Sequence, residues 1–220
     1  MIRPTTMDFL SIAKTIGWDH EQNGNTVNLR CPLESGNVYT FSAQKNEVLN
    51  RAEAELTDFC PQIYIYERQN DLHSARCHPL SEAALQAEAQ EIAEHLKELN
   101  TVFDRTINLF LVSNLLKKAE DLDWAVVQED ADSVFLRKFS PAGEDFGICV
   151  STADIVSDVR QQILDFDTED HVSILLQASR NGLEGVPDLK TLTEDADAIE
   201  EMLRELANEL ETVEEMYYKA

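Results

Sequence analysis

The stretch "EIAEHLKEL" at residues 91–99 returns as "AIEEMLREL" at residues 198–206, which is 107 positions further along the chain. Five of the nine residues are identical, and Lys97 and Arg204 keep a positive charge at the same place. Both stretches combine acidic residues with leucine and isoleucine at helical spacing. A match at a fixed spacing indicates a duplicated unit if it extends beyond one helix.

The agreement at this spacing extends over strand-like segments. The sequence "NTVNLRCPLESGNVYTFSA" at 25–43 aligns with "DSVFLRKFSPAGEDFGICV" at 132–150, where valine, leucine, arginine and glycine recur in order. Further along, "ELTDF" at 55–59 aligns with "QILDF" at 162–166. Collinear matches over segments of different secondary structure rarely arise by chance, so the sequence predicts a tandem duplication.

The two copies are predicted to cover residues 1–105 and 106–220. After a slip of one residue, the two tryptophans of the chain, Trp18 and Trp124, also align. A three-stranded meander with one apolar face is marginally stable by itself and needs a cover. We therefore expect the copies to face each other about a pseudo-twofold axis, as the subunits of a homodimer do.

Each copy is predicted to fold as α-β-β-β-α-α, so the chain belongs to the α+β class. The first helix is amphipathic, and the strands form a small antiparallel meander that helices cover. The dipeptide Asn23-Gly24 favours a hairpin turn because both residues tolerate positive φ. The predicted strands are 18–22, 26–31 and 38–43 in copy one, and 124–128, 133–139 and 145–150 in copy two.

The last predicted helix follows Pro187, and its apolar residues alternate at steps of three and four, which indicates a packing seam. The preceding helix is expected to be capped by Asp167 and to stop at Asn181-Gly182. The sequence leaves open whether the helices between Asn100 and Leu116 are continuous. The seam residues are Leu189, Leu192, Ala196, Ile199, Leu203, Leu206, Leu210, Val213 and Tyr217.

The charge of the chain is strongly negative, with 42 acidic and 18 basic residues and a net charge of −24. Residues 1–107 carry 16 acidic and 9 basic side chains, whereas residues 108–220 carry 26 and 9, so copy two is the more acidic. Phosphate backbones and anionic lipid surfaces repel such a chain, which argues against direct nucleic-acid binding and membrane binding. The charge therefore serves solubility or attracts a basic partner.

No apolar run reaches the length of a membrane span, and the N-terminal residues lack the features of a signal peptide. The cysteines Cys31, Cys60, Cys77 and Cys149 are therefore expected to be reduced thiols in the cytoplasm of a bacterium. The sequence does not fix the oligomeric state, and a homo-oligomer remains open.

Glycine-rich nucleotide-binding motifs and the common hydrolase and metalloprotease motifs are absent from the sequence. One cluster, Cys60, His73, Cys77 and His78, offers thiolate and imidazole ligands for zinc. Its spacing fits no zinc motif, and Asp167 takes the place of Cys60 in copy two. Ordinary loop residues are the simpler interpretation.

A second cluster lies at the start of a predicted helix and consists of Asp165, Asp167, Glu169, Asp170 and His171. Carboxylates beside a histidine bind cations or act in acid–base catalysis. A capped helix start with acidic residues in its first turn explains the carboxylates without any chemistry. The structural interpretation is therefore the preferred one.

The third candidate, which we call the acidic stripe, consists of Asp197, Glu201, Glu205 and Glu209 on the last predicted helix. These residues recur every four positions and therefore share one helix face. One interpretation is a solvated face. The other is a surface for a basic protein, including a protein that normally holds DNA and responds to a mimic of DNA charge.

The segment "ILDFDTEDHVSILLQASRNGLEGVPDLKTLTEDADAIEEMLRELANEL" at 163–210 resembles the C-terminal region of short acidic proteins of unknown function from bacterial phages and mobile elements. The resemblance covers about a quarter of the chain, and copy one lacks the histidine. It implies a bacterial or phage setting and no particular activity. The residues that carry it are Phe166, Asp167, His171, Gly185, Val186 and Pro187.

Together these features favour a non-enzymatic acidic module that binds a protein partner through the acidic stripe and needs no cofactor. The alternative hypothesis is a metal-dependent or hydrolytic enzyme. Such an enzyme would use His171 with its neighbouring carboxylates, or the group of Cys60, His73 and Cys77.

Overall fold

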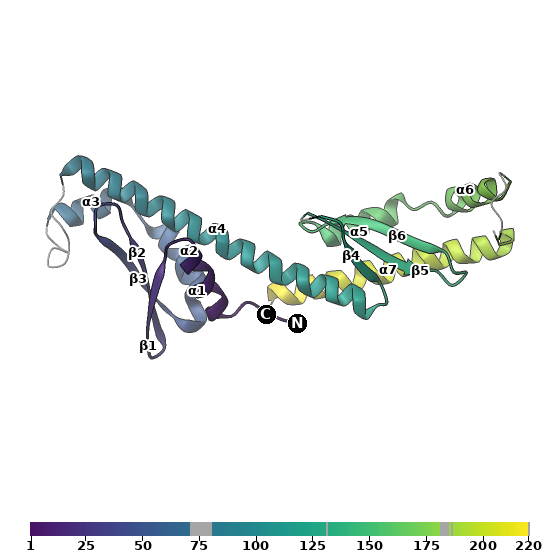
Figure 1. Cartoon of the computed structure of the whole chain (residues 1–220), viewed down its shortest axis with the longest axis horizontal. Coiled ribbons are helices and arrows are strands. Elements are labelled where there is room, and N and C mark those ends of the chain that lie inside the picture. The colour runs from purple at the N-terminus through teal and green to yellow at the C-terminus, as the bar shows by residue number, and fades with distance from the viewer. Residues whose placement is uncertain (71–80, 131, 181–184, 186, 220) are drawn as a thin grey trace. The chain divides into compact units, whose positions relative to one another are not determined.

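The computed structural model describes all of the chain except residues 71–80, 131, 181–184, 186 and 220. The chain divides into an N-terminal unit of residues 3–108 and a C-terminal unit of residues 1–2 and 109–220. The described residues form an α+β fold with two separate three-stranded antiparallel sheets, which confirms the predicted fold class (Figure 1). None of the described helices combines the length and apolarity that a membrane span requires.

The N-terminal unit begins with a helix that its own sequence caps. The hydroxyl of Thr5 accepts a hydrogen bond from the backbone N–H of Asp8, and the Asp8 carboxylate accepts one from the backbone of Thr5 at 2.7 Å. Gly17, with φ of 90°, ends the helix and leads into the sheet. The elements are α1 (Thr6–Thr15), β1 (Asp19–Asn23), β2 (Thr26–Pro32), β3 (Val38–Gln44), η1 (Lys45–Glu47), α2 (Val48–Asp58), α3 (Pro61–Gln69) and the first part of α4 (Glu82–Asp121).

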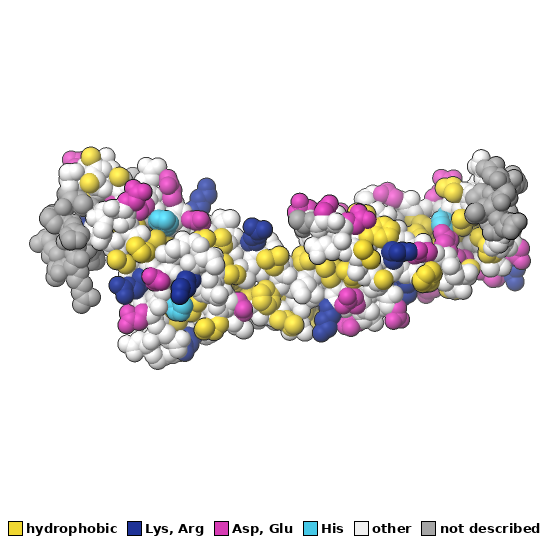
Figure 2. All heavy atoms as spheres, in the orientation of Figure 1, with side chains coloured by type: hydrophobic (Ala, Val, Ile, Leu, Met, Phe, Trp, Pro, Cys, Tyr) yellow, Lys and Arg dark blue, Asp and Glu magenta, His cyan; other side chains and the backbone are white. Residues whose placement is uncertain are grey.

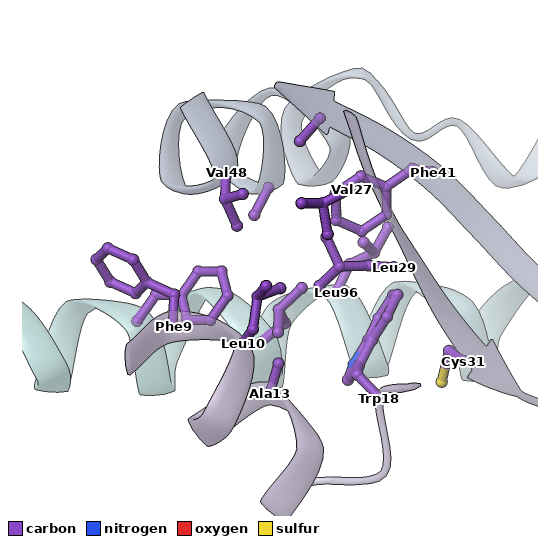
Figure 3. Close-up of a cluster of buried hydrophobic side chains, with 14 of the residues drawn as sticks. Phe9, Leu10, Ala13, Trp18, Val27, Leu29, Cys31, Phe41, Val48 and Leu96 are labelled. Atoms are coloured by element: carbon purple, nitrogen blue, oxygen red, sulfur yellow. The ribbon is translucent and has the colours of Figure 1, made fainter. Parts of the chain in front are cut away.

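The core of the N-terminal unit lies between its sheet and its helices. Alternation along β2 buries Val27, Leu29 and Cys31 and turns the intervening residues away from the core. These side chains and Trp18 pack with apolar residues of α1, α2 and α4, as Figure 3 shows. The sheet is therefore covered by helices of its own unit, so the expected need for a cover is met without a second copy.

The C-terminal unit repeats the succession of a helix, three strands and further helices. The sheet buries Val134 and Leu136 of its central strand and Ile148 and Val150 of the next strand. The elements are the last part of α4, β4 (Ala125–Gln128), β5 (Ser133–Phe139), β6 (Asp145–Ser151), α5 (Ile155–Asp165), α6 (Thr168–Arg180) and α7 (Leu189–Lys219).

The predicted seam on α7 is buried from Leu192 onward, through Tyr217. Leu189 is the exception, because it is the first residue of the helix and 57% of its surface is exposed. The heptad pattern therefore predicted the buried face correctly but began it one helical turn too early. The predicted stop at Asn181-Gly182 lies outside the described residues. The helices between Asn100 and Leu116 are continuous, because α4 runs through this region without a break.

The two sheets have the same strand order, and their central and last strands pair in the same register when positions 107 apart are compared. In one sheet Leu29 pairs with Phe41, and in the other Leu136 pairs with Ile148. The first strand is displaced by one residue, because Asp19 pairs with Arg30 in one sheet and Ala125 pairs with Arg137 in the other. The strand predicted from the polar sequence at 18–22 is also present, as the edge strand β1, and all five of its residues are exposed. An edge strand without buried residues has no apolar alternation, which explains why its sequence signal is weak.

Candidate functional site

The acidic stripe lies on the side of α7 that faces away from the buried seam. Asp197, Glu201 and Glu205 are exposed, as the four-residue spacing predicted. Glu209 differs, because its carboxylate lies 2.7 Å from the ammonium of Lys118 and is half-buried. The hydrogen bond that Lys118 donates to Glu209 raises the pKa of Lys118, and the charge of Glu205 adds to this effect.

The other acidic residues of α7 are largely neutralised by nearby cations. Ion pairs join Lys190 to Glu194, Arg204 to Glu200, Arg160 to Glu211 and Lys219 to Glu215. In the part of the chain that the structure describes, no such pair involves Asp197 or Glu201. The exposed and unpaired charge of α7 is therefore concentrated in the N-terminal half of the acidic stripe.

The cluster that ends in His171 is arranged as a helix start. The carboxylate of Asp167 accepts a hydrogen bond from the backbone N–H of Asp170 at 3.0 Å, which confirms the predicted cap of α6. Asp165 instead accepts a hydrogen bond from Gln161 at 2.9 Å. His171 turns to the β5–β6 turn, where its Nε2 lies 3.1 Å from a carboxylate oxygen of Glu144.

His171 also ends a series of packed aromatic rings, and the N-terminal unit contains a matching series that ends in Tyr64. Successive ring centroids in both units are 5.2–6.5 Å apart. His171 is therefore part of the packing between α6 and the sheet. The two series are Trp18, Tyr39, Phe59 and Tyr64, and Trp124, Phe146, Phe166 and His171.

Two buried carboxylates, Glu88 and Asp195, were missed at the level of the sequence. They are 107 positions apart, and each is at most 4% exposed. Both interrupt the apolar stripe of a helix, since Glu88 lies between Leu85 and Ile92, as Asp195 lies between Leu192 and Ile199. An acidic residue on the apolar side of a helix was the available signal, because such a residue must find hydrogen-bond donors in the core.

Glu88 holds the β2–β3 turn and α3 against α4. Its carboxylate accepts hydrogen bonds from the Ser35 hydroxyl, from the Asn37 amide at 2.7 Å and from the Tyr64 hydroxyl at 2.5 Å. The guanidinium of Arg68 lies 3.5 Å from it. Burial alone would raise the pKa of Glu88, but these donors and the Arg68 charge together lower it below its ordinary value.

Asp195 holds the equivalent β5–β6 turn in the C-terminal unit. Its carboxylate accepts hydrogen bonds from the Ser140 hydroxyl at 2.7 Å and from the backbone N–H of Ala142 at 2.8 Å. Both turns are closed in the same way, by a backbone bond of 2.9 Å from Leu33 to Asn37 in one and from Ser140 to Glu144 in the other.

These carboxylates are structural and not catalytic in their arrangement. The oxygens of Glu88 are already used by donors from the protein, so they are not free to accept a proton from a substrate. In the C-terminal unit the hydroxyl of Ser140 donates to Asp195, while His171 contacts Glu144, so the described contacts do not form a serine–histidine pair.

The described residues contain no group of three or more histidine, cysteine, aspartate or glutamate side chains placed to hold a metal ion. This finding includes the cluster of 165–171. For the other cluster, only Cys60 is described, and its thiol lies 3.2 Å from the side-chain oxygen of Gln62. His73, Cys77 and His78 lie outside the described residues, so the zinc hypothesis for them stays a prediction.

Comparison of the chain with protein-family models, curated proteins and solved structures gave no match.

Proposed function

We propose that this chain is a non-enzymatic, acidic protein-interaction module that binds a basic protein through the acidic stripe of α7. The observation that carries the proposal is the exposed charge of Asp197, Glu201 and Glu205 beside α7 carboxylates that are paired with cations. Long-range attraction between such a surface and a basic partner accelerates association and favours basic partners over acidic ones. The resemblance of 163–210 supports a bacterial or phage setting, and the cysteines, expected to be reduced, support a location in the cytoplasm.

We also propose that the chain arose by tandem duplication of a unit of about 107 residues. Three features recur at that spacing and support the proposal: the strand register, the aromatic series and the buried carboxylate that holds a turn. A pseudo-twofold arrangement of the copies stays a prediction. An experimental structure in which residues 20–100 superpose on 127–207 by a twofold rotation would support it.

The proposed duplication provides a matched control for a test of the acidic stripe. Glu94 and Glu98 on α4 occupy the positions 107 residues before Glu201 and Glu205, and all four are exposed. The test measures binding of a fluorescent lysine–serine peptide to the wild type, to E201Q/E205Q and to E94Q/E98Q. We expect a several-fold loss of affinity only in E201Q/E205Q, and weaker binding to the wild type at high salt because ions screen exposed charges.

Equal losses in the two variants would show that net charge alone attracts the peptide, and the proposed site on α7 would be wrong. If a DNA-binding partner is the target, the wild type should release a basic DNA-binding protein from duplex DNA, and E201Q/E205Q should do so less well. The enzyme hypothesis is tested separately by metal analysis, because stoichiometric zinc or manganese in the purified protein would contradict the proposal.

A further inference from the structure

The outer face of the C-terminal sheet is apolar, although it points away from the core. Its central cross-strand row consists of Val127, Phe135 and Cys149, which are paired directly across β4, β5 and β6. The side chains of this row alternate with the buried Val134 and Leu136, so they lie on the opposite face. Val127 is 45% exposed, and Cys149 is also exposed.

The face continues toward the β5–β6 turn. Gly147 faces Arg137 across the ladder, and a side chain there would meet the ring of Phe135 at 2.5 Å. The ring of Phe135 therefore lies over Gly147 of β6. Phe139 lies on the same face, and 69% of its surface is exposed. Arg137 forms an ion pair with Asp145, which neutralises its charge.

The N-terminal sheet has the same strand order but a polar outer face, so a sheet of this kind does not require an apolar outer face. The row at the equivalent position consists of Glu21, Asn28 and Ser42, and the Ser42 hydroxyl donates a 2.6 Å hydrogen bond to Asn28. Figure 2 shows hydrophobic side chains over the sheet of β4, β5 and β6. Over the sheet of β1, β2 and β3 it shows mostly charged and polar side chains. Contiguous exposed apolar surface is unfavourable in water unless a partner covers it.

The charges around the apolar face indicate what kind of partner covers it. Glu129, Asp130 and Asp132 lie at the β4–β5 turn. Glu144 and Asp145 lie at the opposite end of the strands, where Asp145 is paired with Arg137 and Glu144 contacts His171. A second copy of the chain, docked face to face, would place one acidic rim against another in a molecule of net charge −24. A partner with an apolar centre and a basic border would instead match both features.

We infer that the outer face of β4, β5 and β6 is the docking surface for a basic protein segment that carries aliphatic or aromatic side chains between lysines and arginines. The inference rests on the proposed function and adds a specific surface to it. The sheet makes the apolar contacts with the partner, and the acidic stripe of α7 attracts the partner over a longer range. Burial of Val127, Phe135 and Phe139 then supplies affinity that salt does not screen.

Cys149 makes the inference testable on the unmodified protein, because its thiol is exposed in the central row. Cys31 is buried, and burial raises its pKa to about 11, so it should react slowly with alkylating reagents. Cys60 belongs to the other unit, is partly exposed and serves as the reference. The probe is an amphipathic leucine–lysine peptide, and its control is a lysine–serine peptide of equal length and charge.

We expect the leucine–lysine peptide to slow alkylation of Cys149 by at least fivefold, as measured for each cysteine by mass spectrometry, and to leave Cys60 unchanged. The lysine–serine peptide should protect neither. The variant V127T/F139S should bind the leucine–lysine peptide at least tenfold more weakly, with an unchanged circular dichroism spectrum. The control is V38T, because Val38 is 44% exposed on the other sheet and should matter little.

Two of three outcomes would overturn the inference, and the other would overturn only the role of α7. If E201Q/E205Q weakens peptide binding but Cys149 is not protected, the acidic stripe functions and the sheet face does not. If Cys149 is protected and V127T/F139S binds weakly while E201Q/E205Q binds normally, the sheet face functions and the role of α7 is wrong. If the wild type sediments as a dimer and V127T/F139S as a monomer, the face joins two copies of this chain.

Discussion

The N-terminal and C-terminal units agree in what they bury and differ in what they expose. Leu96 and Leu203 are both fully buried at equivalent positions, and Glu88 and Asp195 both hold a turn from inside the core. The outer faces of the two sheets, by contrast, are polar in one unit and apolar in the other, and the C-terminal unit is the more acidic.

This difference separates the requirements of folding from those of surface chemistry. A buried position must fill a volume and satisfy its hydrogen bonds, so few replacements are tolerated there. An exposed position on a strand or helix tolerates many residues without loss of stability. Where two equivalent exposed surfaces differ as much as these sheets do, the difference needs a cause other than folding, which is why we infer a partner.

The largest expected effect tests the agreement between the cores. Leu96→Ala and Leu203→Ala each remove a fully buried side chain, so each should lower the free energy of unfolding of its own unit by about 3 kcal/mol. The measurement is urea denaturation followed by tryptophan fluorescence, since each unit contains one buried tryptophan, Trp18 or Trp124. A variant that retains only one tryptophan reports one unit. Very unequal losses would contradict the equivalence of the two cores.

The buried carboxylate of Glu88 should contribute more to stability than that of Asp195, because Glu88 has more hydrogen-bond and charge partners. Glu88→Ala removes the acceptor of three hydrogen bonds and a neighbour of the Arg68 cation, and should cost about 3–5 kcal/mol. Asp195→Ala leaves one hydroxyl and one N–H without their acceptor and should cost about 1–3 kcal/mol. The same denaturation experiment measures both variants. A larger loss for Asp195→Ala would show that the Glu88 network contributes less than its contacts indicate.

The pH dependence of stability should distinguish the wild type from Glu88→Gln. The pKa of Glu88 in the folded protein lies below its ordinary value of 4.5, so its ionised form stabilises the fold at any pH above that value. This contribution is lost as the pH falls through the lower folded pKa. The difference in free energy of unfolding between the wild type and Glu88→Gln should therefore be constant from about pH 7 to 5 and shrink below about 4.5. A constant difference down to pH 3 would contradict the lowered pKa.

The smallest expected effect concerns the turn between helix and sheet. Trp18 and Trp124 each donate a backbone hydrogen bond back to the helix, and the residue before each has positive φ, 90° at Gly17 and 64° at Asp123. Because an L-residue is strained there, Asp123→Gly should raise the free energy of unfolding by up to about 1 kcal/mol. The melting temperature should rise slightly as a result. Gly17→Ala should lower stability by about 1 kcal/mol. Differential scanning calorimetry measures both, and stabilisation by Gly17→Ala would contradict this reasoning.

Much of the fold could be predicted because the relevant signals are local. Strand alternation at Val27 and Leu29, and at Val134 and Leu136, identified the buried faces, and the heptad pattern of α7 identified its seam. The same helical periodicity predicted that Asp197, Glu201 and Glu205 would be exposed. The ion pair between Glu209 and Lys118 could not be predicted, since it joins residues of two helices 91 positions apart.

The sequence by itself determined the succession of elements, the faces that they bury and the acidity of the chain, because period, propensity and charge act over a few neighbouring residues. Only the tertiary structure decided which carboxylates meet donors in a core and which remain in water, and that α4 continues without a break from one unit into the other. It also decided that Val127, Phe135 and Cys149 form one row, because the pairing of strands determines which residues become neighbours across a sheet.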